Sequence, residues 1–95
     1  MILTNTRYID GVGFVHDKYM FDENKTGYEI KFKNGNILRQ IAPFSYVEDN
    51  WNDGRYVLFA APFENTYGDI NWYCPADLLS FVIKHKIIIN GIERI

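Results

Sequence analysis

Apolar and polar residues alternate most clearly between positions 26 and 43, where the chain reads TGYEIKFKNGNILRQIAP. Such alternation is typical of β-strands with one face on a core and the other in water. In the middle of the segment stands Asn34-Gly35, a dipeptide that favours a two-residue type I′ turn because both residues tolerate positive φ. The segment is therefore predicted to form an antiparallel hairpin.

The two-residue turn fixes the register of this hairpin and so decides which side chains share a face. The apolar face pairs Phe32 with Ile37, Ile30 with Arg39 and Tyr28 with Ile41, and the polar face pairs Lys33 with Asn36, Lys31 with Leu38 and Glu29 with Gln40. Arg39 is the exception on the apolar face. We expect its stem to pack on the sheet while its guanidinium reaches the rim.

Shorter extended segments are expected on both sides of this hairpin. They are residues 5–16 with a turn at Asp10-Gly11, residues 44–47, residues 55–61, residues 70–73, and residues 87–95 with a turn at Asn90-Gly91. The run 55–61 is nearly all apolar, so it is placed in the interior of the sheet. Pro43 and Pro62 are expected to end strands, because proline has no N–H to donate. Polar connections are expected at 17–25, 48–54 (turning at Asp53-Gly54) and 63–69.

The period changes after Pro75, where apolar residues recur at helical spacing. Leu78, Leu79, Val82 and Ile83 share one face, which predicts an amphipathic helix of about three turns over residues 75–86. Proline suits the first helical position, and Asp77 complements the positive end of the helix dipole. Together with the strands, this helix predicts a single α+β domain spanning residues 1–95, an antiparallel meander of about five to seven short strands with one helix.

Composition favours a soluble setting for this domain. The formal net charge is −2, and no apolar run approaches the about 20 residues that a membrane-spanning helix needs. No apolar signal region follows Met1, and the single cysteine, Cys74, has no partner within the chain. We therefore expect a cytoplasmic protein that does not bind membranes.

No residue pattern points to a cofactor or a metal ion, and none is expected. The two histidines, His16 and His85, lack the ligand spacing of a metal site. Cys74 precedes the predicted helix, a position that can activate a thiol. However, Pro75 removes one N–H donor, and His85 lies eleven residues further on, about 16 Å away at helical rise. No catalytic residue is assigned, and a Cys74-dependent enzyme is kept as an alternative.

Acidic and aromatic residues gather in the second half of the chain, between positions 48 and 69. The candidate binding residues are Glu48, Asp49, Trp51, Asp53, Tyr56, Glu64, Tyr67 and Asp69. If the loops 48–54 and 63–69 lie at the same end of the sheet, these side chains form one acidic surface with aromatic anchors. Such a surface suits docking on a protein with a basic surface.

The sequence thus favours a small non-enzymatic binding protein that docks on or occludes another macromolecule, of the inhibitor, immunity or phage-accessory type. One alternative is a nucleic-acid-binding module that uses Lys31, Lys33 and Arg39 with aromatic side chains on the sheet. Nucleic acid is the less favoured partner because the four candidate lysines form no dominant cluster: Lys31, Lys33, Lys84 and Lys86. Self-association through strand edges, notably residues 92–95, is a further alternative.

Overall fold

The computed structural model describes residues 1–51, 54–87 and 89–95, and for Trp51 the backbone alone. Asp53, which belongs to the expected Asp53-Gly54 turn and to the candidate surface, therefore lies outside the described residues, as does the side chain of Trp51. The described residues form nine strands and one helix: β1 Ile2–Ile9, β2 Gly13–Met20, β3 Glu29–Lys31, β4 Ile37–Gln40, β5 Ser45–Trp51, β6 Gly54–Asn65, β7 Ile70–Tyr73, α1 Pro75–Lys84, β8 Ile89–Asn90 and β9 Glu93–Arg94.

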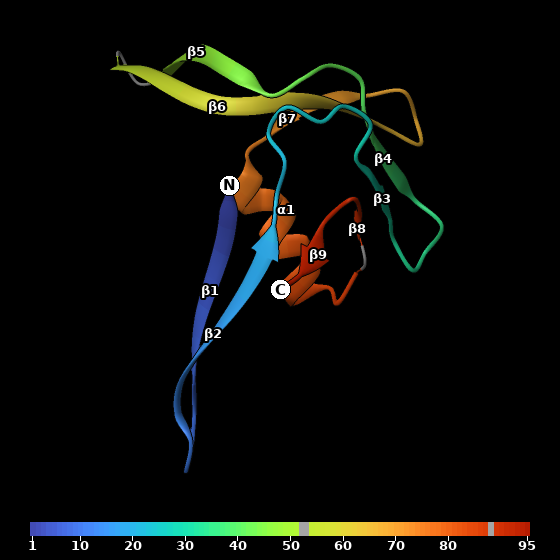
Figure 1. Ribbon diagram of the computed structural model, residues 1–95. Coiled ribbons are helices and arrows are strands. Elements are labelled where there is room, and N and C mark those ends of the chain that lie inside the picture. The colour runs from blue at the N-terminus through green and yellow to red at the C-terminus, as the bar shows by residue number, and fades with distance from the viewer. Residues whose placement is uncertain (52–53, 88) are drawn as a thin grey trace.

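Two antiparallel sheets lie on opposite sides of the helix (Figure 1). The smaller sheet has the strand order β1-β2-β9, and the larger has the order β5-β6-β4-β3-β8, with β7 also paired to β6. The predicted α+β class with one helix is confirmed. The strand number is higher than expected, partly because the last segment contributes two short strands instead of a hairpin.

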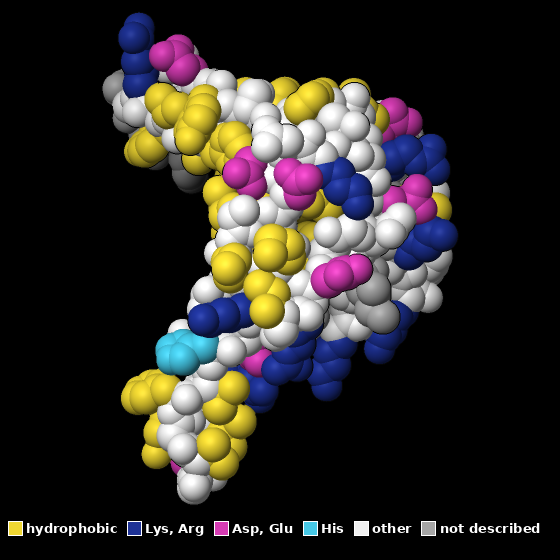
Figure 2. All heavy atoms as spheres, in the orientation of Figure 1, with side chains coloured by type: hydrophobic (Ala, Val, Ile, Leu, Met, Phe, Trp, Pro, Cys, Tyr) yellow, Lys and Arg dark blue, Asp and Glu magenta, His cyan; other side chains and the backbone are white. Residues whose placement is uncertain are grey.

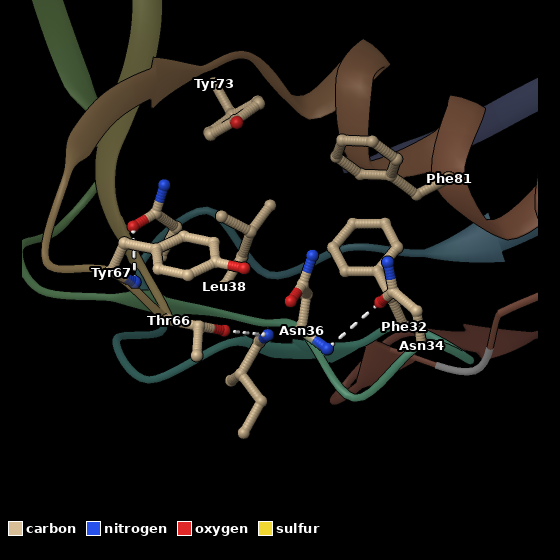
Figure 3. A pocket seen from close by; sticks show the side chains of 10 residues that line it. Phe32, Asn34, Asn36, Leu38, Thr66, Tyr67, Tyr73 and Phe81 are labelled. Carbon is tan, nitrogen blue, oxygen red and sulfur yellow. Dashed lines mark hydrogen bonds between the residues drawn. The ribbon is translucent and has the colours of Figure 1, made fainter.

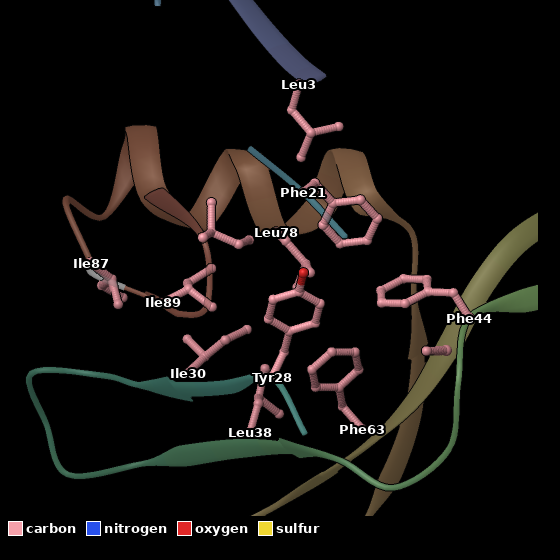
Figure 4. Packing of buried hydrophobic residues seen from close by; sticks show 12 residues of the cluster. Leu3, Phe21, Tyr28, Ile30, Leu38, Phe44, Phe63, Leu78, Ile87 and Ile89 are labelled. Atoms are coloured by element: carbon pink, nitrogen blue, oxygen red, sulfur yellow. The ribbon is translucent and has the colours of Figure 1, made fainter. Parts of the chain in front are cut away.

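The core fills the space between the helix and the larger sheet (Figure 4). Phe21 and Tyr28 stack with ring centroids 5.4 Å apart, and Phe44 packs edge-on against Phe21 at 5.1 Å. Leu78 on α1 and Phe63 on β6 are fully buried. The buried aromatic rings of this cluster each contribute a large apolar area to stability.

The helix is confirmed, with its last helical residue at Lys84 instead of residue 86. Pro75 occupies its first turn, and the carboxylate of Asp77 accepts a hydrogen bond from the backbone N–H of Cys74 at 2.8 Å. Both features stabilise the N-terminus of a helix. None of the described residues belongs to a helix that is long and apolar enough to cross a membrane.

The predicted register of the β3–β4 hairpin is wrong by one residue. Its pairs are Glu29 with Arg39, Ile30 with Leu38 and Lys31 with Ile37. The loop contains three residues, since the N–H of Phe32 donates to the carbonyl of Asn36 and the N–H of Gly35 donates to the carbonyl of Phe32. Gly35 has φ of +88°, whereas Asn34 lacks the positive φ that a type I′ turn requires. An ordinary turn closed by a left-handed glycine therefore replaces the expected one.

This shift reverses the faces of β4 while leaving those of β3 as predicted. Tyr28 and Ile30 are buried as expected, but their neighbours on the core side are Leu38 and Gln40. Arg39 lies on the outer face, where its Nε contacts Glu29 Oε2 at 3.3 Å. The predicted exception of an arginine on the apolar face therefore does not exist.

Several predicted loops are strands. Residues 17–20 belong to β2, residues 48–51 belong to β5, and residues 63–65 belong to β6. β6 continues through Pro62, whose carbonyl accepts a hydrogen bond from the N–H of Ile41 at 3.0 Å. The run 55–61 is also less interior than predicted, because residues 55–58 are exposed.

Candidate functional site

The candidate acidic surface is divided by the strands on which its members lie. Glu48 and Asp49 are neighbours on β5, so their side chains point to opposite faces. Asp49 is paired with Tyr56 on one face, and Glu48 is paired with Val57 on the other. Of the members of this part of the surface whose side chains the structure describes, Asp49 and Tyr56 are brought together as hypothesised.

The remaining members lie at the other end of β6. Glu64 is near the end of this strand, and Tyr67 and Asp69 lie in the β6–β7 turn, where Asn65 Oδ1 accepts hydrogen bonds from both of their N–H groups at 2.9 Å. β6 has 12 residues, which corresponds to about 36 Å between its ends. The loops around 48–54 and 63–69 are therefore at opposite ends of one strand, and they do not form the single surface on which the hypothesis depended.

A different feature is evident in the shape of the molecule. Its radius of gyration is 14.9 Å, whereas about 12 Å is expected for a compact domain of this length. Two hairpins extend from the body and give the molecule a crescent outline (Figure 2). We call β5 and the first part of β6, residues 45–51 and 54–60, the upper arm, and we call the β1–β2 hairpin, residues 2–20, the lower arm.

The upper arm continues the core side of the larger sheet beyond the core itself. Ala61 and Phe63 face the core, and Phe59 and Val57 share their side of β6 because side chains alternate along a strand. Phe59 is still partly covered, with Phe44 at 5.7 Å. Tyr46 lies directly opposite Phe59 on β5 and contacts its ring at 5.0 Å, yet it is 77% exposed, and Val57, further along β6, is 64% exposed.

The lower arm has one face on the helix and the other in solvent. Leu3, on the first of these faces, is part of the buried core. The solvent face carries apolar side chains at both ends, listed here in paired order: Ile2 with Met20, and Tyr8 with Phe14. Phe14 is 74% exposed, and its ring meets that of Tyr8 edge-on at 5.3 Å.

Hydrophobic side chains on both arms border the hollow of the crescent (Figure 2). We call the exposed apolar side chains on these inner faces the concave surface: Ile2, Tyr8, Phe14, Met20, Tyr46 and Val57. Exposed apolar side chains gathered on one side of a molecule in this way are typical of an interaction site. One signal for this surface is present in the sequence, since Tyr8 and Phe14 each stand three residues from Gly11.

An ion-pair cluster holds the lower arm to the body. Asp17 is only 6% exposed, and its two carboxylate oxygens contact Arg7 Nε and a terminal nitrogen of Arg94, each at 2.7 Å. The hydrogen bond from Arg7 is the main cause that lowers the pKa of Asp17, and the positive charges of Arg7 and Arg94 lower it further against the effect of burial. Because Arg94 lies on β9, the cluster joins the arm to the C-terminal segment.

The lowered pKa of Asp17 predicts a pH-dependent contribution to stability. A carboxyl group whose folded pKa lies below its unfolded value of about 3.9 stabilises the fold at higher pH, and loses this effect as pH falls through the folded pKa. We expect Asp17→Asn to lower the melting temperature by several degrees at pH 7. The gap between wild type and variant should close below about pH 4. Thermal unfolding followed by circular dichroism from pH 7 to pH 2 measures it, with the exposed Glu48→Gln as control, and a gap that is independent of pH would contradict the assignment.

Cys74 has the surroundings of an unreactive thiol. Burial raises its pKa, and the negative charge of Asp77 raises it further, so the thiolate is disfavoured. His16 lies on the lower arm, bonded to Thr6 Oγ1 at 2.9 Å, and the ring of His85 packs against Phe81 at 5.9 Å. Among the described residues, no group of three His, Cys, Asp or Glu side chains is placed to hold a metal ion.

The surface of the nucleic-acid alternative is also dispersed. Lys31 and Arg39 both lie within 3.5 Å of Glu29, which offsets their charge. Tyr28, the first aromatic residue of this hairpin, is fully buried and cannot stack on a base. Residues 92–95, suggested as an edge for self-association, contribute only the two-residue β9, which pairs with β2. Comparison of the chain with known protein families, with curated proteins and with solved structures finds no match to any of them.

Proposed function

We propose that this protein is a non-enzymatic binding protein that grips another protein between its two arms and occludes the surface it covers. The observation that carries the proposal is the concave surface, where aromatic and aliphatic side chains on two separate hairpins border one hollow. Exposed tyrosine, phenylalanine and methionine are the residue types enriched in protein interfaces. Exposing these apolar side chains to water has an unfavourable free energy, and a partner that covered them would remove it.

Charge indicates the chemistry of the partner. The upper arm carries Glu48, Asp49 and Asp53 in its sequence against Arg55 alone, so it is acidic as a whole. A partner with an apolar protruding segment, flanked by basic residues on the side of the upper arm, would complement both properties. We propose that the complex forms in the cytoplasm, because a chain with a single cysteine cannot form an internal disulfide and such chains are typical of a reducing compartment.

The proposal predicts that both arms are needed for binding. Each of two double variants, Tyr8→Ser with Phe14→Ser and Tyr46→Ser with Val57→Ser, should weaken the partner's affinity at least about tenfold, since aromatic anchors dominate such interfaces. Wild type and each variant are immobilised and incubated with an extract of the native host, and the captured proteins are quantified by mass spectrometry. The partner is the protein that wild type captures and that both variants lose. Its affinity is then measured with purified components.

A matched control lies on β6, on either side of Val57. Tyr56→Ser with Leu58→Ser changes exposed side chains on the outer face of the upper arm, so it should retain the partner. Unchanged melting temperatures would show that the variants are folded. The proposal is wrong if every captured protein is retained equally by both arm variants.

A further inference from the structure

A pocket unrelated to the arms lies where the β3–β4 loop, the β6–β7 turn and α1 meet (Figure 3). Its volume is about 350 Å³, within the range of small-molecule sites. Phe32, Leu38, Tyr73 and Phe81 line its inner part, and Tyr67 stands at its rim, 77% exposed. None of these residues belongs to the concave surface, so the two sites are independent.

The walls of this pocket are aromatic and held in place by the core. Phe81 meets Phe32 edge-on at 5.5 Å and Tyr73 at 5.8 Å, which fixes three rings around one space. Figure 3 shows Asn36 between Tyr67 and Phe32, with its amide group pointing into the pocket. A flat ring entering this space would meet ring faces and edges on more than one side.

The polar side-chain groups of the pocket are the amides of its asparagines and the hydroxyls of Thr66, Tyr67 and Tyr73, and none of its described lining residues is charged. Three of these groups already accept hydrogen bonds. Asn34 Oδ1 accepts from the N–H of Asn36 at 3.0 Å, Thr66 Oγ1 accepts from the N–H of Ile37 at 2.8 Å, and Asn65 Oδ1 accepts from the N–H groups of Tyr67 and Asp69 at 2.9 Å. The side-chain amide of Asn36 makes no hydrogen bond to any residue that the structure describes. It therefore offers one donor and one acceptor, side by side, to a ligand.

We propose that this pocket binds an uncharged nucleobase, with adenine as the base that fits its polar group. An asparagine amide pairs with adenine through two hydrogen bonds, accepting from the N6 amino group and donating to N7. The aromatic walls supply the stacking surface that flat bases use in proteins. Because the lining residues carry no charge, the base or nucleoside occupies the pocket and any phosphate lies outside it.

The test uses two ligands that differ only in the group Asn36 recognises. Adenosine should bind the full chain saturably in titration calorimetry and in saturation-transfer NMR. Purine riboside, which lacks the N6 amino group, should bind about tenfold more weakly. In Asn36→Ala the two ligands should bind alike, because the discriminating amide is gone. Tyr67→Ala should weaken both ligands by a similar factor, since it removes ring contact alone.

Asn71→Ala, an exposed asparagine on β7 outside the pocket, is the control and should leave both affinities unchanged. Asn36→Ala should also keep the wild-type melting temperature, because the turn uses the backbone of this residue and not its side chain. The proposal is overturned if adenosine shows no saturable binding at millimolar concentration, or if purine riboside binds wild type as tightly as adenosine. Either result would leave the proposed grip on a partner protein untouched.

Discussion

Phe63→Ala is expected to cause a large loss in the free energy of unfolding. Phe63 is fully buried on β6, with the ring of Tyr73 at 5.6 Å and that of Phe44 at 6.3 Å. Removing a buried phenylalanine ring costs about 3–5 kcal/mol, and a domain of this size has roughly 5–14 kcal/mol in total. Urea unfolding followed by circular dichroism should therefore show a midpoint reduced by about a fifth or more.

Ile70→Ala provides the comparison. Ile70 lies on β7, opposite Glu64, which follows Phe63 on β6, but the side chain of Ile70 is exposed. It should cost less than about 1 kcal/mol, since little apolar area is lost from the interior. A loss below about 1 kcal/mol for Phe63→Ala would show that this ring is not in the core and would contradict the arrangement of the larger sheet.

Gln40→Ala is the second large effect that we expect. Gln40 is 5% exposed, its Oε1 accepts from the N–H of Tyr28 at 3.0 Å, and its Nε2 donates to the carbonyls of Ala42 and Lys25 at 3.0 and 3.3 Å. Alanine would leave three backbone groups without these partners. A buried polar group without a partner costs about 1–3 kcal/mol, so a total loss of about 3 kcal/mol is expected in the same urea experiment.

The adjacent Arg39→Ala is the matched control for Gln40→Ala. Arg39 is exposed on the outer face, and exposed ion pairs contribute about 0–1 kcal/mol. Under the register first predicted from the sequence, Arg39 packs on the apolar side and Gln40 lies in water, so the order of the two effects would be reversed. A larger loss for Arg39→Ala than for Gln40→Ala would therefore support the other register.

The helix and the hairpin strand β3 could be predicted because their signals are local. Leu78, Leu79, Val82 and Ile83 repeat at helical spacing, and Tyr28 and Ile30 alternate with charged residues. The register of β4 could not be predicted, because it depends on whether Lys33 belongs to the strand or to the turn. Asn34-Gly35 is compatible with both a two-residue and a three-residue loop, and a shift of one residue exchanges the faces of a strand.

The expectation of a single acidic surface was not met for a related reason. Glu48, Asp49 and Asn50 have the composition of a loop, yet they form a strand because β6 is long enough to pair with them. Pro62 was expected to end a strand. A proline is nevertheless tolerated in a strand where its carbonyl, and not its missing N–H, makes the hydrogen bond to the next chain segment, here to the N–H of Ile41. Such pairing decisions depend on residues far away in the chain, so polarity alone does not reveal them.

The C-terminal segment has a consequence for how the chain is made. Ile89 and Asn90 pair with β3, and Glu93 and Arg94 pair with β2, so six consecutive residues complete both sheets. During synthesis on the ribosome, neither sheet can acquire its last strand until these residues have left the exit tunnel. The protein is therefore expected to reach its native state only after this segment emerges, and nascent chains arrested before residue 89 should remain sensitive to protease.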